Sequence, residues 1–128
     1  MNQIAFLPAK VPEIIPAMIS FMRDLRRQYC TMQMKGRVNY IELAASAHKR
    51  IIAIHPFNDG NDILARLVMN NLLMRGGHSP VFFPNSEEYV QKTTKGHTDN
   101  ASFIQYLEEC LTMTKDLKEE LSLLSKLL

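Results

Sequence analysis

One stretch of the sequence, residues 54–67, holds the residues whose types and spacing could carry chemistry. It contains a histidine, a carboxylate, a glycine turn and an arginine, in the order His55, Asp59, Gly60 and Arg66. An imidazole can act as a general base near neutral pH, and a carboxylate can hold a hard cation. The backbone N–H groups at a helix N-terminus attract anions, and a glycine lets an anion approach them. A base, a cation ligand and an anion site so close together indicate phosphate chemistry.

The surrounding sequence predicts that this stretch is a tight loop between two helices. Pro56 disfavours helical geometry at His55, so the preceding helix should end there. Residues 58–61 are turn-forming, and the apolar residues that follow recur at helical spacing. We therefore expect His55 at the start of the loop and Asp59 in its middle. The N–H groups at the start of the next helix are those of Gly60, Asn61 and Asp62.

The stretch resembles the signature of Fic-domain proteins, H-P-F-x-D/E-G-N-G/K-R-x-x-R. The matching residues are His55, Pro56, Phe57, Asp59, Gly60, Asn61 and Arg66. The resemblance continues on both sides and covers most of the chain, from residue 11 to residue 111. It implies an all-α, Fic-type helical bundle with the active loop between two central helices and at most a small β element.

The resemblance also implies a protein adenylyltransferase, a nucleotidyltransferase that moves AMP from ATP onto a Ser, Thr or Tyr hydroxyl of a target protein. In this family His55 would be the general base and Asp59 the Mg²⁺ ligand. The nucleotide-binding residues would be Gly60, Asn61, Asp62 and Arg66. ATP as donor and Mg²⁺ are therefore the expected cofactors, and a target protein is the expected partner.

Two positions depart from the signature. Asp62 stands where the family has Gly or Lys, and Ile63 stands where it has the first Arg. A carboxylate about 4–6 Å from the phosphates costs several kcal/mol at an effective dielectric near 20. Ile63 cannot replace a guanidinium that would bind the β and γ phosphates. We therefore expect impaired transfer, and the alternative is a catalytically inactive Fic-like module that binds a protein or a nucleotide.

Several of these residues have a structural alternative. Asp59 could form an Asx turn, and Arg66 could pair with Asp62 or Asp59. His48 lies two helical turns before the loop on the same helix face, but no third ligand follows at zinc spacing. A buried, hydrogen-bonded structural histidine is therefore favoured there over a metal ligand. Phe57 is expected to anchor the loop in the core.

Apolar periodicity and capping signals predict the other elements. The expected helices cover residues 11–30, 40–54 after an Asn39 cap, 61–74, a short stretch around 86–90, and 101–128. The inward residues expected in the first helix are Ile15, Met18, Ile19, Met22, Leu25 and Tyr29. Those expected in the third helix are Leu64, Leu67, Val68, Asn71 and Leu72. Residues 31–38 and 92–100 should be loops, and Gly76-Gly77 should end the third helix.

Length and composition predict one domain over residues 1–128. The net charge of +2 is too weakly basic for a nucleic-acid-binding surface. No apolar run approaches the ~18 residues of a membrane span, which excludes a transmembrane helix. Two distant cysteines and the lack of a signal-peptide pattern favour a cytoplasmic protein.

The two ends of the chain suggest further features. Residues 1–10 are expected to form an N-terminal arm, with room for half of the family's target-docking flap. Residues 117–128 extend the last helix beyond what one small core needs, and their leucines could pack on a second chain to form a homodimer. The self-inhibiting S/T-x-x-x-E-G/N pattern of some family members is absent, since Thr112 precedes Asp116 and Thr114 precedes Lys118 at that spacing.

Overall fold

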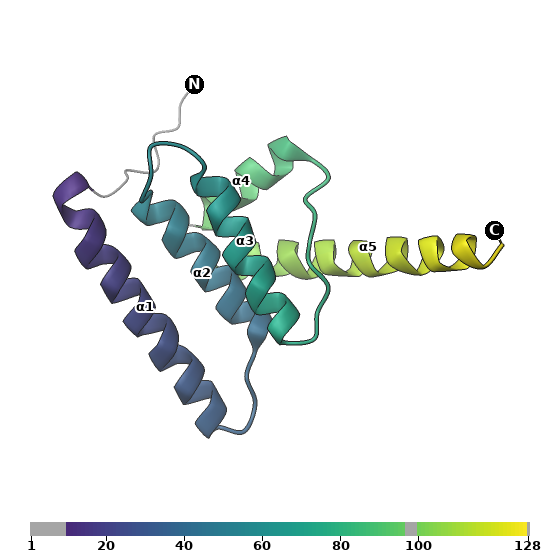
Figure 1. The fold of residues 1–128 in the computed structure, drawn as a ribbon, viewed down its shortest axis with the longest axis horizontal. Coiled ribbons are helices and arrows are strands. Elements are labelled where there is room, and N and C mark those ends of the chain that lie inside the picture. The colour runs from purple at the N-terminus through teal and green to yellow at the C-terminus, as the bar shows by residue number, and fades with distance from the viewer. Residues whose placement is uncertain (1–9, 97–99, 128) are drawn as a thin grey trace.

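The computed structural model describes residues 10–96 and 100–127. These residues form five α-helices and no strand: α1 (Val11–Met34), α2 (Tyr40–Ile54), α3 (Asn61–Arg75), α4 (Ser86–Gly96) and α5 (Asn100–Leu127). The first three helices run alongside one another, while α5 crosses them and projects beyond the bundle (Figure 1). The all-α prediction is confirmed, whereas nearly all of the predicted N-terminal arm lies outside the described residues. None of the described helices is long and apolar enough to cross a bilayer.

Helix α2 lies at the centre of the bundle and contacts α1, α3 and α5. It begins as predicted, because the Asn39 Oδ1 accepts a 3.1 Å hydrogen bond from the Glu42 N–H. Its buried residues are Leu43, Ala44, Ala45, Ala47, His48, Ile51 and Ile54. Three alanines on this surface allow neighbouring helices to approach closely. The loop that follows α2 is thus held by the best-packed helix of the molecule.

Helix α1 differs from its prediction in length and in its inward face. It continues to Met34, because nothing interrupts it before Gly36, which has φ +90°. Met18 and Leu25 pack against the core as expected, but Ile15 and Met22 are 71% and 64% exposed, and Phe21 is the fully buried residue. The sequence carries apolar residues at helical spacing on two faces of α1, and only contact with α2 decides which one is buried.

Helix α3 has the predicted position, and its predicted inward face is correct in part. Leu64, Val68 and Leu72 pack against the core as expected, but Leu67 is 66% exposed and Asn71 is also exposed. The buried residues are Asn61, Ala65, Met69 and Leu73. Apolar residues surround most of this helix, so periodicity alone could not identify the face that packs against α2.

The end of α3 depends on glycine for a packing reason. A Cβ atom built on Gly76 would lie 2.6 Å from the Cβ of Tyr40, at the start of α2. Gly77 then turns the chain with φ +84°. The predicted stop at these glycines is confirmed, and Gly76 also permits the close approach of α2 and α3.

The segment between α3 and α4 is extended and is pinned to α3 by Asn70. The Val81 N–H donates to the Asn70 Oδ1 over 2.8 Å, and Val81 is buried. Helix α4 then runs to Gly96, so the prediction of a loop from residue 92 was wrong at its start. No helix-breaking residue lies between Glu87 and Gly96, which explains the longer helix.

Candidate functional site

The predicted base, His55, sits at the junction of α2 and the loop in a left-handed conformation, with φ 55° and ψ 59°. Its N–H donates to the Ile51 carbonyl over 2.9 Å, which completes the C-terminal cap of α2. Pro56 disfavours the right-handed helical region for the preceding residue, which ends α2 as predicted, although a following proline favours extended rather than left-handed geometry. A non-glycine residue in this region carries about 1–2 kcal/mol of strain. The imidazole is therefore held at a fixed, strained point.

The loop is closed by the side chain of Asn61, the first residue of α3. Its Oδ1 accepts from the Phe57 N–H at 3.0 Å, and its Nδ2 donates to the Phe57 carbonyl at 2.7 Å. Asn61 is only 5% exposed, so these two bonds fix the loop within the protein interior. The prediction that the Phe57 side chain anchors the loop was wrong, because the ring is 59% exposed. The backbone of Phe57, gripped by Asn61, provides the anchor.

Gly60 makes the turn into α3. It adopts φ 79°, a conformation that favours glycine, although a Cβ there would meet no atom within 4 Å. The Asp59 Oδ1 accepts the Gly60 N–H at 2.9 Å, which is the local turn that the sequence offered as an alternative. The second carboxylate oxygen of Asp59 has no hydrogen-bond partner in the described part of the chain, and Asp59 is exposed. Asp59 thus stabilises the turn and still presents an oxygen to solvent.

The N-terminus of α3 opens at the same place. Gly60 has no side chain to cap it, and the first-turn N–H groups of residues 61–63 have no hydrogen-bond partner among residues 10–96 and 100–127. Unpaired N–H groups and the helix dipole make this end positive. Asp62 places a carboxylate in that first turn, and the Ile63 side chain is 66% exposed beside it.

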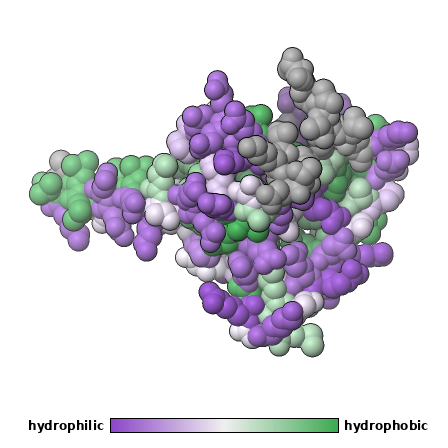
Figure 2. All heavy atoms as spheres, turned by 180° about the vertical axis from the view of Figure 1, so that it is seen from behind, coloured by the Kyte–Doolittle hydropathy of each residue, from purple (hydrophilic) through white to green (hydrophobic). Residues whose placement is uncertain are grey.

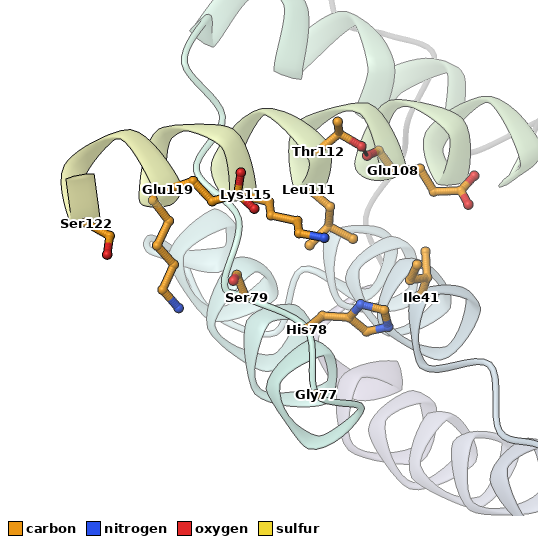
Figure 3. A pocket seen from close by; sticks show the side chains of 11 residues that line it. Ile41, Gly77, His78, Ser79, Glu108, Leu111, Thr112, Lys115, Glu119 and Ser122 are labelled. Carbon is orange, nitrogen blue, oxygen red and sulfur yellow. Dashed lines mark hydrogen bonds between the residues drawn. The ribbon is translucent and has the colours of Figure 1, made fainter. Parts of the chain in front are cut away.

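A pocket of about 470 Å³ unites these features. It is lined by Ile52, His55, Asn58, Asp59, Gly60, Asn61, Asp62, Ile63 and Arg66. All six predicted site residues thus line one pocket, although their roles remain predictions. A larger cavity, about 630 Å³, lies elsewhere, between α5 and residues 77–79 (Figure 3).

The Arg66 side chain is supported by Tyr89, which the sequence did not indicate as part of the site. Its guanidinium carbon lies 5.3 Å from the centre of the Tyr89 ring, and its Nε donates to the Asp62 carbonyl at 3.4 Å. The predicted alternatives, ion pairs with the Asp62 or Asp59 side chains, do not form. Tyr89 belongs to α4, and only folding brings it beside α3. A tyrosine at helical spacing gave no signal of this contact.

The buried His48 fixes Tyr89 in turn. Its Nε2 lies 2.7 Å from the Tyr89 hydroxyl, and its ring stacks on Phe103 with centroids 4.8 Å apart. The expectation of a buried, hydrogen-bonded histidine is confirmed. Burial and then the Asp62 carboxylate raise the pKa of Tyr89 well above its usual range, while Arg66 lowers it. The hydroxyl therefore stays neutral, and the ring is a rigid support for the guanidinium.

The carboxylates of the site could hold a metal ion only if a bound phosphate-containing ligand supplied further oxygen donors. Among the described residues no group of three or more His, Cys, Asp or Glu side chains could hold a metal ion. Mg²⁺ commonly takes one or two carboxylates and completes its shell with phosphate oxygens and water. The exposed oxygen of Asp59, and Asp62 in the same pocket, fit that donor set.

Comparison with known proteins identifies relatives that match most of the chain. The chain is 38% identical over 107 residues to "Protein adenylyltransferase Fic" of Culex quinquefasciatus, which covers 80% of this chain and 21% of that protein. It is 38% identical over 82 residues to the protein of that name in Aedes aegypti, covering 60% of this chain and 16% of the relative. The chain therefore spans about a fifth of the length of these curated relatives.

A solved structure shares the fold. A Fic domain containing signaling protein from Bacteroides thetaiotaomicron VPI-5482 has a TM-score of 0.66 and 30% sequence identity, covering 83% of this chain and 44% of that one. The Fic/DOC family model matches residues 1–73, which include α1, α2 and the loop. With these matches and the arrangement of its loop, the chain belongs to the Fic/DOC family.

Proposed function

We propose that this chain transfers AMP from ATP onto a hydroxyl group of a target protein, with an efficiency that Asp62 and Ile63 reduce. One observation carries the proposal. The pocket places the strained His55, the exposed carboxylate of Asp59 and the uncapped N-terminus of α3 around a single cavity. The relationship to proteins named adenylyltransferases supports it.

Each residue has a chemical task in the proposed reaction. Bound ATP and Mg²⁺ supply the electrophilic α-phosphorus and the pyrophosphate leaving group. His55 takes the proton from the target hydroxyl as its oxygen bonds to that phosphorus, and Asp59 holds the cation. The N–H groups of residues 61–63 bind phosphate oxygens. Arg66, supported by Tyr89, adds positive charge at the same end of the pocket.

A second candidate function is a non-catalytic Fic-like module that binds a protein or a nucleotide without turnover. Asp62 favours it, because its carboxylate lies in the first turn of α3 and competes with a phosphate for the positive helix end. Ile63 favours it too, because its exposed side chain lines the pocket without offering a hydrogen-bond donor. Binding and transfer must therefore be measured separately.

Calorimetry with ATP and Mg²⁺ tests the nucleotide site. We expect measurable binding by the native chain, loss of binding in Asp59→Ala, and at least ~100-fold tighter binding in the Asp62→Gly, Ile63→Arg double variant, since each 1.4 kcal/mol is a factor of ten. Asp116→Ala, an exposed acid on α5, is the matched control and should bind as the native chain does. Binding by the double variant alone would favour the non-catalytic module with respect to ATP.

Transfer is tested by incubating the native chain with ATP labelled in its α-phosphate and an extract of proteins. The label should become covalently attached to protein with the native chain and more strongly with the double variant. His55→Ala should remove the labelling while leaving nucleotide affinity within a few-fold. Equal labelling with and without His55 would contradict the assigned base.

A further inference from the structure

Helix α5 has two halves with different surroundings. Its buried residues, Phe103, Tyr106, Leu107 and Cys110, all lie in the first half. The second half extends past the bundle into solvent (Figure 1). There Leu117, Leu121 and Leu124 are 55%, 58% and 54% exposed. We call these three residues the leucine face.

The leucine face continues the stripe that packs inside the protein. Its spacing of four and three residues is also that of Phe103, Leu107 and Cys110, with Thr114 completing the series between the two sets. The first set packs in the core against α2 and α4. The second set presents the same side of α5 to solvent, and apolar atoms gather at this end of the molecule in Figure 2.

The projecting half of α5 has no packed face of its own within the described residues. Isolated helices of about 12–15 residues are marginal in water, and most helical stability comes from packing an apolar face. The heptad spacing of the leucine face suits a second helix. The charges of this half are balanced, with Lys115, Lys118 and Lys126 against Asp116, Glu119 and Glu120. Two copies of this half therefore do not repel each other through net charge.

We infer that the leucine face binds the leucine face of a second copy of this chain, with the two α5 helices antiparallel. A parallel partner would run toward the first half of α5, where α2 and α4 already occupy this side of the helix. An antiparallel partner avoids both, because the two bundles then lie at opposite ends of the paired segment.

The charges also select a register for the antiparallel pair. When Leu121 lies opposite Leu124 of the second copy, Lys118 faces Ser125 and Glu120 faces Leu127, so no like charges meet. When Leu121 lies opposite Leu117 instead, Lys118 meets Lys118 and Glu120 meets Glu120. The first register is therefore favoured, and it pairs Leu121 of each copy with Leu124 of the other.

Sedimentation and light scattering of the full chain test the dimer. We expect a reversible monomer–dimer equilibrium, weakened at least ~100-fold in Leu121→Gln, Leu124→Gln, at about tenfold per lost leucine contact. The matched control is Lys115→Gln, Glu119→Gln. It keeps the net charge and alters the groove on the other side of α5 (Figure 3), so it should dimerise as the native chain does.

Two results would overturn the inference. The first is a native chain that remains monomeric at every concentration, which would assign the face to another protein. The second is equal weakening in both double variants. Helicity measured by circular dichroism for each variant shows whether the bundle is intact. Because the substituted side chains are exposed, we expect each variant to keep an intact bundle.

Cross-linking tests the orientation. In a Cys30→Ser background, which leaves only the buried Cys110, chains with Lys118→Cys and with Ser125→Cys are prepared separately. Mixing them should yield a disulfide-linked pair on mild oxidation, while either chain alone should yield little. A dimer in which the mixture links no better than its components would contradict the antiparallel arrangement. None of these measurements uses nucleotide, so their results test dimer formation independently of the proposed function.

Discussion

At the scale of single residues, the site combines local strain with support from distant side chains. The end of α2 at His55 follows from its neighbour Pro56, whereas the position of Arg66 depends on Tyr89 from another helix. The strained conformation of His55 persists because both ends of the loop are fixed. The first end is bonded to α2, and the Asn61 side chain holds the Phe57 backbone. Both kinds of control can be tested by stability measurements that need no nucleotide.

The strain at His55 predicts an unusual order of stability. Glycine adopts φ 55° without the 1–2 kcal/mol that other residues require, but it loses more entropy on folding. We expect His55→Gly to be about 0.5–1 kcal/mol more stable than His55→Ala in urea denaturation. At Ala53 in α2 the usual order should hold, so Ala53→Gly should be about 1 kcal/mol less stable than the native chain. A more stable His55→Ala would show that the loop relaxes.

The raised pKa of Tyr89 predicts a loss of stability in alkali. The folded protein holds the hydroxyl proton more tightly than the unfolded chain, so deprotonation favours unfolding. Stability should therefore be intact below the ordinary tyrosine pKa of about 10 and decline as the pH rises above it. Tyr89→Phe should cost about 1–3 kcal/mol at pH 7, because the buried hydrogen bond between His48 and the Tyr89 hydroxyl is lost. Its stability should nevertheless decline less steeply above pH 10, and equal slopes would contradict this account.

At the scale of the helices, small differences in packing decide which apolar face is buried. Helix α1 offers two faces of similar character, and Phe21 rather than Ile15 meets α2. The Arg50 side chain, on α2, adds an ion pair with Asp24 at 2.9 Å and lies over the Phe21 ring at 5.6 Å. That pair is partly exposed and contributes little by itself. The attachment of α1 therefore rests on apolar packing, in which Phe21 is the most deeply buried side chain of the helix.

Alanine substitutions on the two faces of α1 test this assignment. Phe21→Ala should cost about 3–5 kcal/mol of unfolding free energy, because the ring is 5% exposed and leaves a cavity. Ile15→Ala, on the face that periodicity predicted to be inward, should change stability by less than about 0.5 kcal/mol. Urea denaturation measures both. A large loss in Ile15→Ala would place that face in an interface.

At the scale of the whole molecule, one helix connects the folded bundle to a surface that the bundle does not cover. The first half of α5 completes the core around α2, and the second half contributes no buried residue. The bundle and the projecting half should therefore respond differently to the same substitution. The candidate site lies on the α2–α3 loop and does not involve the projecting half.

Two leucines on the same stripe of α5 provide the comparison. Leu107→Ala should cost about 2–5 kcal/mol at any protein concentration, because Leu107 is fully buried. Leu124→Ala should cost less than about 0.5 kcal/mol in dilute solution and more as the protein is concentrated. Thermal melts at several concentrations measure both. A concentration-independent loss in Leu124→Ala would contradict pairing through the projecting half.

The sequence by itself determined the helical class, the loop and the residues around the pocket. These depend on neighbours in the chain: Pro56 acts on His55, Gly60 acts on the turn, and Asn39 and Gly77 mark helix ends. The family signature is also contiguous, so the match to Fic proteins needed no tertiary information. Local chemistry of this kind is readable because each residue limits the backbone angles of the next.

The tertiary structure alone decided the rest. Helices α1 and α3 carry apolar residues on more than one face, and their buried residues depend on the shape of α2. The Phe57 side chain does not anchor the loop as expected. The Phe57 backbone does so instead, because the side-chain amide of Asn61, four residues later, hydrogen-bonds to it. Tyr89 reaches Arg66 only after α4 folds against the bundle. Contacts between distant segments depend on how surfaces fit together, and a one-dimensional pattern does not record that fit.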